Sequence, residues 1–329
     1  MPETMNTCHS PGVHCHWSSI TGCLNALVPG FNSAHVFLAG HGLKTDYQIE
    51  KKCDFSGLLL TNHFSRLYPV FFERNGLNFE YVDVNYSFPE LLKRIKQEND
   101  RGFPVIISLF SRKIPYHAAF HSTSSNMHCV AVSTVESNRL YVHDFFIPTH
   151  PVSEFHGWVG KEELRSGWED SIKKVYFFNR EETDFLKKNC CGKINYEKLL
   201  FELREYLKTG RTGIALFLQD FRECAENNPQ TIRENVRQIC FALQFDSVVP
   251  SRKLLSDVFK RAGHEYSEAV DQLEQFVKEW YKITFSLMKY SYGRTNTGFI
   301  RISQRMDWVM EQERQLLKGI CEWKTGTGR

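Results

Sequence analysis

The first half of the chain alternates between helix-like and strand-like patterns of hydrophobic positions. PVIISLF (104–110) is a continuous apolar run of strand length, which is typical of a buried strand. SSNMHCVAVSTVESNRLYVHDFF (124–146) predicts two strands joined by a turn. Helical spacing appears over 16–27, 64–77, 89–102 and 161–168, and further strands are predicted over 79–85 and 173–178. These patterns predict an α+β fold with a central, largely antiparallel sheet.

Beyond about residue 185 the hydrophobic pattern becomes helical throughout. Apolar residues recur every three to four positions over 194–210, 215–228, 231–245, 251–263, 267–290 and 301–323. The sequence therefore predicts an α+β domain over residues 1–185 and an α-helical domain over residues 186–329.

Composition and charge are those of an ordinary globular protein and exclude few functions. The chain has 329 residues, of which 42% are hydrophobic and 24% charged, as in an ordinary globular protein. A net charge of +3 is too small to indicate nucleic-acid binding. The charge is uneven, because residues 186–329 hold 24 Lys and Arg against 18 Asp and Glu, whereas residues 1–185 hold 17 against 20.

The location expected from the sequence is the cytoplasm. No apolar run approaches the ~18 residues that a membrane helix needs. The first residues, MPETMNTCHSPGVHCHW, lack the basic and apolar regions of a signal peptide. Ten irregularly spaced cysteines then favour reduced thiols over disulfides. The oligomeric state is left open, a homodimer included.

A histidine and an aspartate lie at matching ends of the predicted hairpin. His128 is near the start of its first strand and Asp144 near the end of its second. A carboxylate in apolar surroundings needs a partner, because its burial as an unpaired ion is costly. A lone histidine at a strand edge is most often structural, but this pairing favours a general base with its orienting carboxylate.

Cys15 is the candidate nucleophile that would complete such a site. It precedes a predicted helix that is rich in small residues. The positive end of the helix dipole and the unpaired backbone N–H groups favour a thiolate there, and can also hold an oxyanion. The chain order of cysteine, histidine and carboxylate is that of papain-like thiol enzymes.

Other cysteines are weaker candidates. Cys23 lies two turns into the same helix, where the dipole effect has faded, and is typical of a small core residue. Cys8 lies in a segment with little pattern, and Cys129 should point to the opposite face of its strand from His128. Cys190 and Cys191 are interpreted as structural or exposed thiols.

Metal and nucleotide sites are the alternatives from other classes. CHSPGVHCH (8–16) holds two cysteines and three histidines, which zinc favours. The second pair of ligands would come from Cys53, His35 or His41, at no recognisable spacing. We therefore expect no metal ion. Phosphate-loop and dinucleotide-binding signatures are missing from the sequence.

A succession of motifs resembles the butirosin-biosynthesis protein H family over nearly the whole chain. The motifs are HCHWSSITGCLNAL, VFLAGHGLKTDY, VIISLF leading to IPY, MHCVAVSTVESNRLYVHD and KEELRSGW. The resemblance implies a papain-like catalytic domain followed by a helical domain. It also implies transfer of an acyl group from a carrier-protein thioester to an amine in antibiotic assembly. By position, Cys15 would be acylated, His128 would shuttle the proton and Asp144 would orient the imidazole.

The chain departs from the family pattern at several positions. His41 stands where a glycine-rich turn is expected, and Ser133 and Thr134 stand where such folds often have Gly-Tyr. No glutamine precedes Cys15, so His9 or a backbone N–H would have to serve as the oxyanion donor.

The expected function is a cysteine acyltransferase of specialised metabolism. An acyl carrier protein would bring the pantetheine thioester, a small amine would accept the acyl group, and no other cofactor is required. Neither nucleic acid nor a membrane is expected as a partner. A papain-like peptidase or amidase, and a non-catalytic binding module on the same fold, are the alternatives.

Substrate and carrier contacts are also predicted. The substrate-binding candidates are His9, His16, Tyr116 and Phe145. Apolar walls that exclude water from the acyl-enzyme are expected from Phe120, Phe145, Phe146 and Trp158, which are equally typical of a core. Basic residues predicted to dock an acidic carrier are Lys187, Lys188, Lys193, Arg252, Lys253, Lys260 and Arg261.

Overall fold

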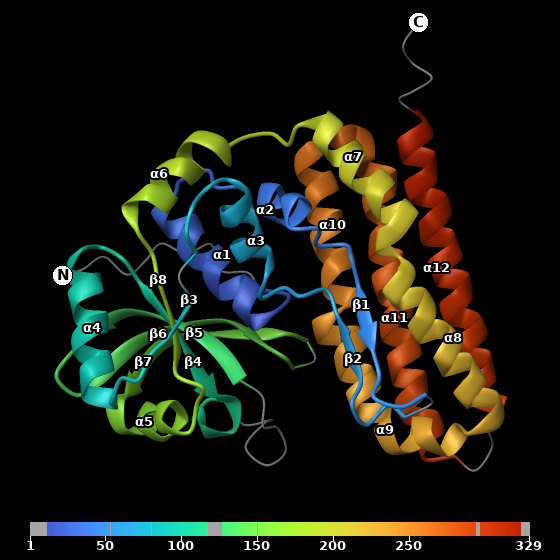
Figure 1. The fold of residues 1–329 in the computed structure, drawn as a ribbon, viewed down its shortest axis with the longest axis horizontal. Helices are drawn as coiled ribbons and strands as arrows, with labels where there is room; N and C mark the ends of the chain where they lie inside the picture. Colours follow the sequence, from blue (N-terminus) through green and yellow to red (C-terminus); the bar gives the residue numbers. More distant parts are fainter. Residues whose placement is uncertain are drawn as a thin grey trace, which may run out of the picture. The chain divides into compact units, whose positions relative to one another are not determined.

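The chain forms two compact units, and each of them is made of two separate stretches of the sequence. The computed structural model describes residues 12–52, 54–79, 81–117, 127–149, 151–293 and 297–323. The first unit comprises Met1–Ser33 and Tyr68–Gly192, and the second comprises Ala34–Leu67 and Lys193–Arg329. This division differs from a single boundary after residue 185, because residues 34–67 group with the C-terminal helices (Figure 1).

A six-stranded sheet organises the first unit. Its order is β3 (Tyr81–Asp83), β8 (Lys174–Phe177), β4 (Val105–Phe110), β5 (Met127–Val135), β6 (Arg139–Ile147) and β7 (Ser153–Gly160). All neighbouring strands are antiparallel, which confirms the predicted α+β class and the antiparallel sheet. Strand β7 was not predicted, because glycine and polar residues interrupt its alternation.

Helices cover both faces of this sheet (Figure 1). The helices are α1 (Cys15–Leu27), α3 (Leu67–Arg74), α4 (Phe88–Asp100), α5 (Lys161–Glu169) and α6 (Arg180–Asn189). α4 and α5 pack their apolar side chains, Trp168 among them, onto a cluster that includes Val130 and Val142. α1 packs against β5 and β6, where Gly22 leaves room for the ring of Phe145. Since neighbouring residues of a strand point to opposite faces, α1 lies opposite α4 and α5.

The second unit is mainly helical, as predicted. It contains α2 (Ala34–Ala39), α7 (Tyr196–Glu205), α8 (Thr212–Asn227), α9 (Pro229–Phe241), α10 (Val248–Ala262), α11 (Ser267–Ser291) and α12 (Thr297–Trp323). A short hairpin of β1 (Asp46–Gln48) and β2 (Leu59–Thr61) joins them. The pattern did not predict the π-helical turns Tyr206–Gly210 and Ala242–Asp246. In the described part of the chain, the helices are too short or too polar to cross a bilayer.

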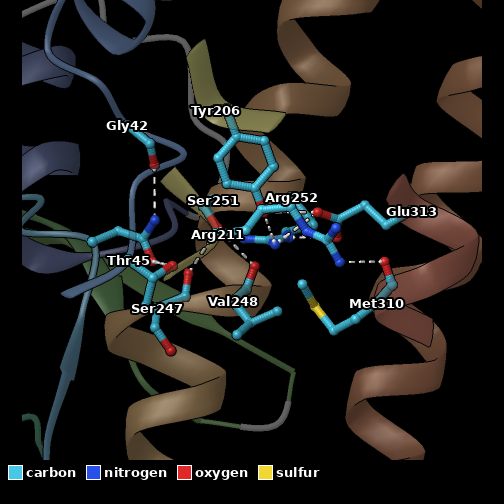
Figure 2. Close-up of polar contacts among 11 residues, drawn as sticks. Gly42, Thr45, Tyr206, Arg211, Ser247, Val248, Ser251, Arg252, Met310 and Glu313 are labelled. Atoms are coloured by element: carbon cyan, nitrogen blue, oxygen red, sulfur yellow. Dashed lines mark hydrogen bonds and ion pairs between the residues drawn. The ribbon is translucent and has the colours of Figure 1, made fainter. Parts of the chain in front are cut away.

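A buried ion pair joins α10 to α12 in the second unit. Arg252 is fully buried, and its Nε and Nη2 each donate to a carboxylate oxygen of Glu313 at 2.8 Å (Figure 2). Tyr206 accepts from Arg252 at 2.7 Å and donates to Glu313 at 3.0 Å. The predicted docking role of Arg252 is therefore wrong, because its guanidinium is enclosed among helices instead of facing solvent.

The close approach of α8 and β1 depends on a glycine. A Cβ atom at Gly213 would lie 1.9 Å from the carbonyl oxygen of Thr45. We expect Gly213→Ala to lower the unfolding free energy by about 1–3 kcal/mol, because the backbone must shift to relieve the overlap. Gly319→Ala on α12 is the control, since nothing lies within 4 Å of the added Cβ. It should raise the unfolding free energy by about 1 kcal/mol through helix propensity. Urea unfolding checks both variants, and an undiminished stability of Gly213→Ala would contradict the packing.

Candidate active site

The hairpin of β5 and β6 brings His128 and Asp144 together. Ala131 pairs with His143 across the two strands, so His128 and Asp144 lie diagonally on one face. Nε2 of His128 lies 2.9 Å from both oxygens of the Asp144 carboxylate. The predicted pair is therefore confirmed. The register shifts after Asp144, where the backbone N–H of Phe146 donates to Oδ1 at 3.1 Å.

A second histidine, His117, holds the same carboxylate. Its Nε2 lies 2.8 Å from Oδ2 of Asp144, and its ring centroid lies 4.4 Å from that of His128. His117 follows IPY in the irregular segment after β4, and it is buried. The sequence analysis does not predict His117 as a site residue, because an irregular turn has no hydrophobic periodicity. Its position directly after the IPY motif was the available sign that it lies near the site.

His128 and Asp144 form a buried ion pair. Burial alone would raise the pKa of Asp144, but the two histidines lower it to about 2. Burial would likewise lower the pKa of His128, but the charge and hydrogen bond of Asp144 raise it above the usual value. The buried carboxylate therefore remains ionised and favours the imidazolium form of His128.

Acid should weaken the fold through Asp144. Its folded pKa of about 2 lies below the value of about 3.9 in unfolded chains, so the stabilisation is complete above about pH 4. As the pH falls from about 4 to about 2, we expect a loss of about 2 kcal/mol. Urea unfolding over this range measures it, and Asp144→Asn should show a shallower decline. Equal slopes in the two proteins would contradict the ion pair.

Tyr116 is the predicted substrate residue that lies beside this carboxylate. Its ring stacks on Phe155 with centroids 4.0 Å apart. Its hydroxyl is buried next to the Asp144 carboxylate. Burial, together with the charge of Asp144, raises the pKa of Tyr116 well above its usual value.

Cys15 begins α1, as the sequence predicts, and its thiol contacts a second cysteine. The half-buried thiol of Cys15 donates to the sulfur of Cys129, which raises the pKa of Cys15 and lowers that of Cys129. The hydroxyls of Tyr81 and Ser108 lie 3.3 and 3.6 Å from the Cys129 sulfur. The sequence placed Cys129 on the face opposite His128 but gave no sign that this face meets Cys15.

The thiols and the histidine–carboxylate group lie on opposite faces of the sheet, near the same strand ends. His128 and Asp144 lie two residues from Val130 and Val142 and therefore share their face on the α4 and α5 side, whereas Cys129 lies on the α1 side. Among the described residues, no hydrogen bond joins Cys15 to His128, so the expected contact between the nucleophile and its base is not found; Cys15 contacts Cys129 instead. The charge of Asp144 nevertheless contributes to the raised pKa of Cys15, so the two groups interact electrostatically.

The backbone before α1 is fixed at this end of the sheet. The N–H of Gly12 donates to the carbonyl of Phe145 at 2.7 Å. The N–H of Val13 donates to the hydroxyl of Ser18 at 3.0 Å, which anchors the segment to the first turn of α1. Cys15 is thereby held next to the part of β6 that carries Asp144.

The remaining predicted residues have varied positions. His16 is buried and contacts Cys129, with its ring 4.7 Å from that of Tyr81. Phe145 is buried where α1 packs on the sheet, and Phe146 is also buried. Trp158 on β7 is 39% exposed. His9, Cys8, Cys53 and Phe120 lie outside the described residues.

The rival cysteines and the rest of the metal alternative are also located. Cys23 is buried, and burial raises its pKa. Cys190 is buried and Cys191 exposed, and the described cysteines form no disulfide. His41, weighed as a zinc ligand, instead contacts Glu202 of the second unit at 3.0 Å.

Comparison with known proteins adds no assignment. No protein-family model matches the chain, and no curated protein matches it either. The chemistry of the site is therefore the basis for a function.

Proposed function

We propose that the chain is a papain-like cysteine acyltransferase that works in a reducing cytoplasm. It moves an acyl group from the pantetheine thioester of a carrier protein to a small amine, in the assembly of a specialised metabolite. The observation that carries the proposal is the buried Asp144, which holds His128 at 2.9 Å in the same unit that presents Cys15 at a helix N-terminus. These are the parts that acyl transfer through a thiol requires.

The nucleophile in this proposal is Cys15. Of the two cysteines in contact, Cys129 is only 4% exposed, whereas Cys15 is half-buried. The Cys15 thiol passes its proton to the Cys129 sulfur, which already accepts its S–H, and attacks the thioester carbonyl. Backbone N–H groups at the start of α1 stabilise the oxyanion. The pantetheine sulfur leaves and takes a proton that reaches it from the His128 imidazolium through water at the shared strand ends.

The second half of the reaction uses the neutral imidazole. The amine attacks the acyl-enzyme, His128 accepts the amine proton, and the amide leaves as the Cys15 sulfur departs. Asp144 stabilises the imidazolium that forms, and His117 positions the carboxylate through Oδ2.

Intact mass spectrometry tests this chemistry. A panel of acyl N-acetylcysteamine thioesters should give a single acyl adduct on Cys15, which an added amine discharges as an amide. Discharge to free acid in the presence of amines would favour the peptidase or amidase. The absence of any adduct, with equal labelling of Cys15 and the exposed Cys191 by iodoacetamide, would favour a non-catalytic binding module.

The carrier should dock through basic residues near the end of α6. Lys187 and Lys188 occupy its last turn, and Lys187 contacts only the exposed Asp184, at 3.5 Å, among the ion pairs of the described chain. Turnover from a carrier-bound donor should fall as salt rises, since such docking is electrostatically steered. Turnover from the small neutral thioester should change little.

Charge reversal separates docking from chemistry. Lys187→Glu with Lys188→Glu should raise the KM for the carrier alone, while Lys96→Glu on α4 serves as an exposed control. Equal salt sensitivity of the two donors would remove the case for docking on α6.

A further inference from the structure

We propose that His117, His128 and Asp144 also form a binding site for a divalent transition-metal ion, Zn²⁺ in particular. One ligand atom from each of the three residues lies within 4.8 Å of the others, and all three residues are buried. They come from three separate segments: the turn after β4, strand β5 and strand β6. The fold therefore brings these three donor atoms close together.

The arrangement of the donors suits a metal ion. Nε2 of His117 and Nε2 of His128 both face the Asp144 carboxylate, at 2.8 and 2.9 Å. In a general base held by a carboxylate, the carboxylate orients a single imidazole. Asp144 contacts two, so the contact with His117 is additional to what that role requires. Two imidazole nitrogens and one carboxylate oxygen form a donor set that zinc and other late first-row ions bind.

Charge and surroundings favour the same ligand. The buried carboxylate supplies negative charge, and a bound cation would replace the imidazolium proton of His128 as its counter-charge where solvent does not reach. Phe146 holds Oδ1 through its N–H, which is the kind of outer hydrogen bond that orients a ligating carboxylate. The buried hydroxyl of Tyr116 adds an oxygen near the carboxylate.

Metal binding would change the state of both imidazoles. Each Nε2 lone pair binds the ion, so each ring carries its remaining proton on Nδ1. His128 then has no lone pair with which to accept a proton from the amine. If the proposed acyl transfer is right, Zn²⁺ is a reversible inhibitor of it; the binding itself does not depend on that function.

X-ray absorption at the zinc edge tests the site in the wild-type protein. After treatment with chelator, the full chain is loaded with one equivalent of Zn²⁺. We expect nitrogen and oxygen neighbours at about 2.0–2.2 Å, with the outer scattering of imidazole. Sulfur at about 2.3 Å would overturn the proposal, because it would assign the ion to Cys15 and Cys129.

Affinity measurements on variants identify the ligands. His117→Gln should weaken Zn²⁺ binding by at least about 100-fold, since even the loss of an outer partner costs about 10–100-fold. Asp144→Asn should do the same. His143→Gln is the matched control, because His143 is a buried neighbour of Asp144 that contacts Ser133 at 2.9 Å instead.

The outcomes separate this site from its rivals and from the proposed function. Wild-type affinity in His117→Gln, or loss of binding in His143→Gln, would overturn the proposal. Absence of bound zinc in the wild-type protein would overturn it as well, while leaving acyl transfer intact. Failure of acyl transfer with the expected zinc spectrum would instead overturn the function alone.

Discussion

Replacing Cys15 with alanine should lower the rate of acyl transfer by at least about 10⁴-fold, because the covalent intermediate can no longer form. The fold should be unaffected, since the half-buried side chain at the start of α1 contributes little packing. Steady-state turnover of an acyl N-acetylcysteamine thioester measures the rate, and a thermal melt checks the fold.

Cys129→Ala is the matched control for this prediction. It removes the sulfur that accepts the Cys15 S–H, and this contact is the largest cause of the raised pKa of Cys15. The pKa of Cys15 should therefore fall and turnover should survive. If Cys15→Ala stays active while Cys129→Ala is inactive, Cys129 is the nucleophile and the assignment of Cys15 is wrong.

Glu313→Gln should lower the unfolding free energy by about 3–5 kcal/mol, the cost of leaving one member of a buried ion pair without its partner. Arg252 is 0% exposed and donates twice to this carboxylate (Figure 2). The pKa of Arg252 is raised although burial alone would lower it, because the charge of Glu313 outweighs burial. The guanidinium therefore stays charged in the variant and has lost its counter-ion.

A pair on the surface of the same unit provides the comparison. Lys260 and Glu274 lie 2.9 Å apart and are about half exposed, so Glu274→Gln should cost less than about 1 kcal/mol. Replacing Arg252 and Glu313 together with Met and Leu should recover much of the loss. Urea unfolding measures all three variants, and a cost for Glu313→Gln as small as that for Glu274→Gln would contradict the ion pair.

The sequence predicted those features that local pattern determines. The antiparallel sheet and the helices of the second unit follow from periodicity. The contact of His128 with Asp144 follows from the hairpin, because a short turn fixes the register of two adjacent strands. The position of Cys15 at a helix N-terminus has the same local origin.

The features that the sequence did not predict depend on distant contacts. His117 reaches Asp144 from an irregular turn, and no periodicity marks such a residue. The sequence of α10 predicts a docking role for Arg252, because nothing in that helix points to Glu313 on α12. The hairpin of β1 and β2 was missed because each strand has only three residues, and its partners follow much later in the chain.

Because residues 34–67 belong to the second unit, the order in which the chain is synthesised affects how that unit folds. The chain passes from the first unit to the second after Ser33, and returns at Tyr68. Tyr47 of this segment donates to Asp220, and the N–H of Asn62 donates to the carbonyl of Asp246. As the chain leaves the ribosome, this segment emerges long before those partners exist. The nascent segment can form only its own contacts, such as the pairing of β1 with β2, until the later helices are made, and the order of synthesis makes the helical unit the last to be completed.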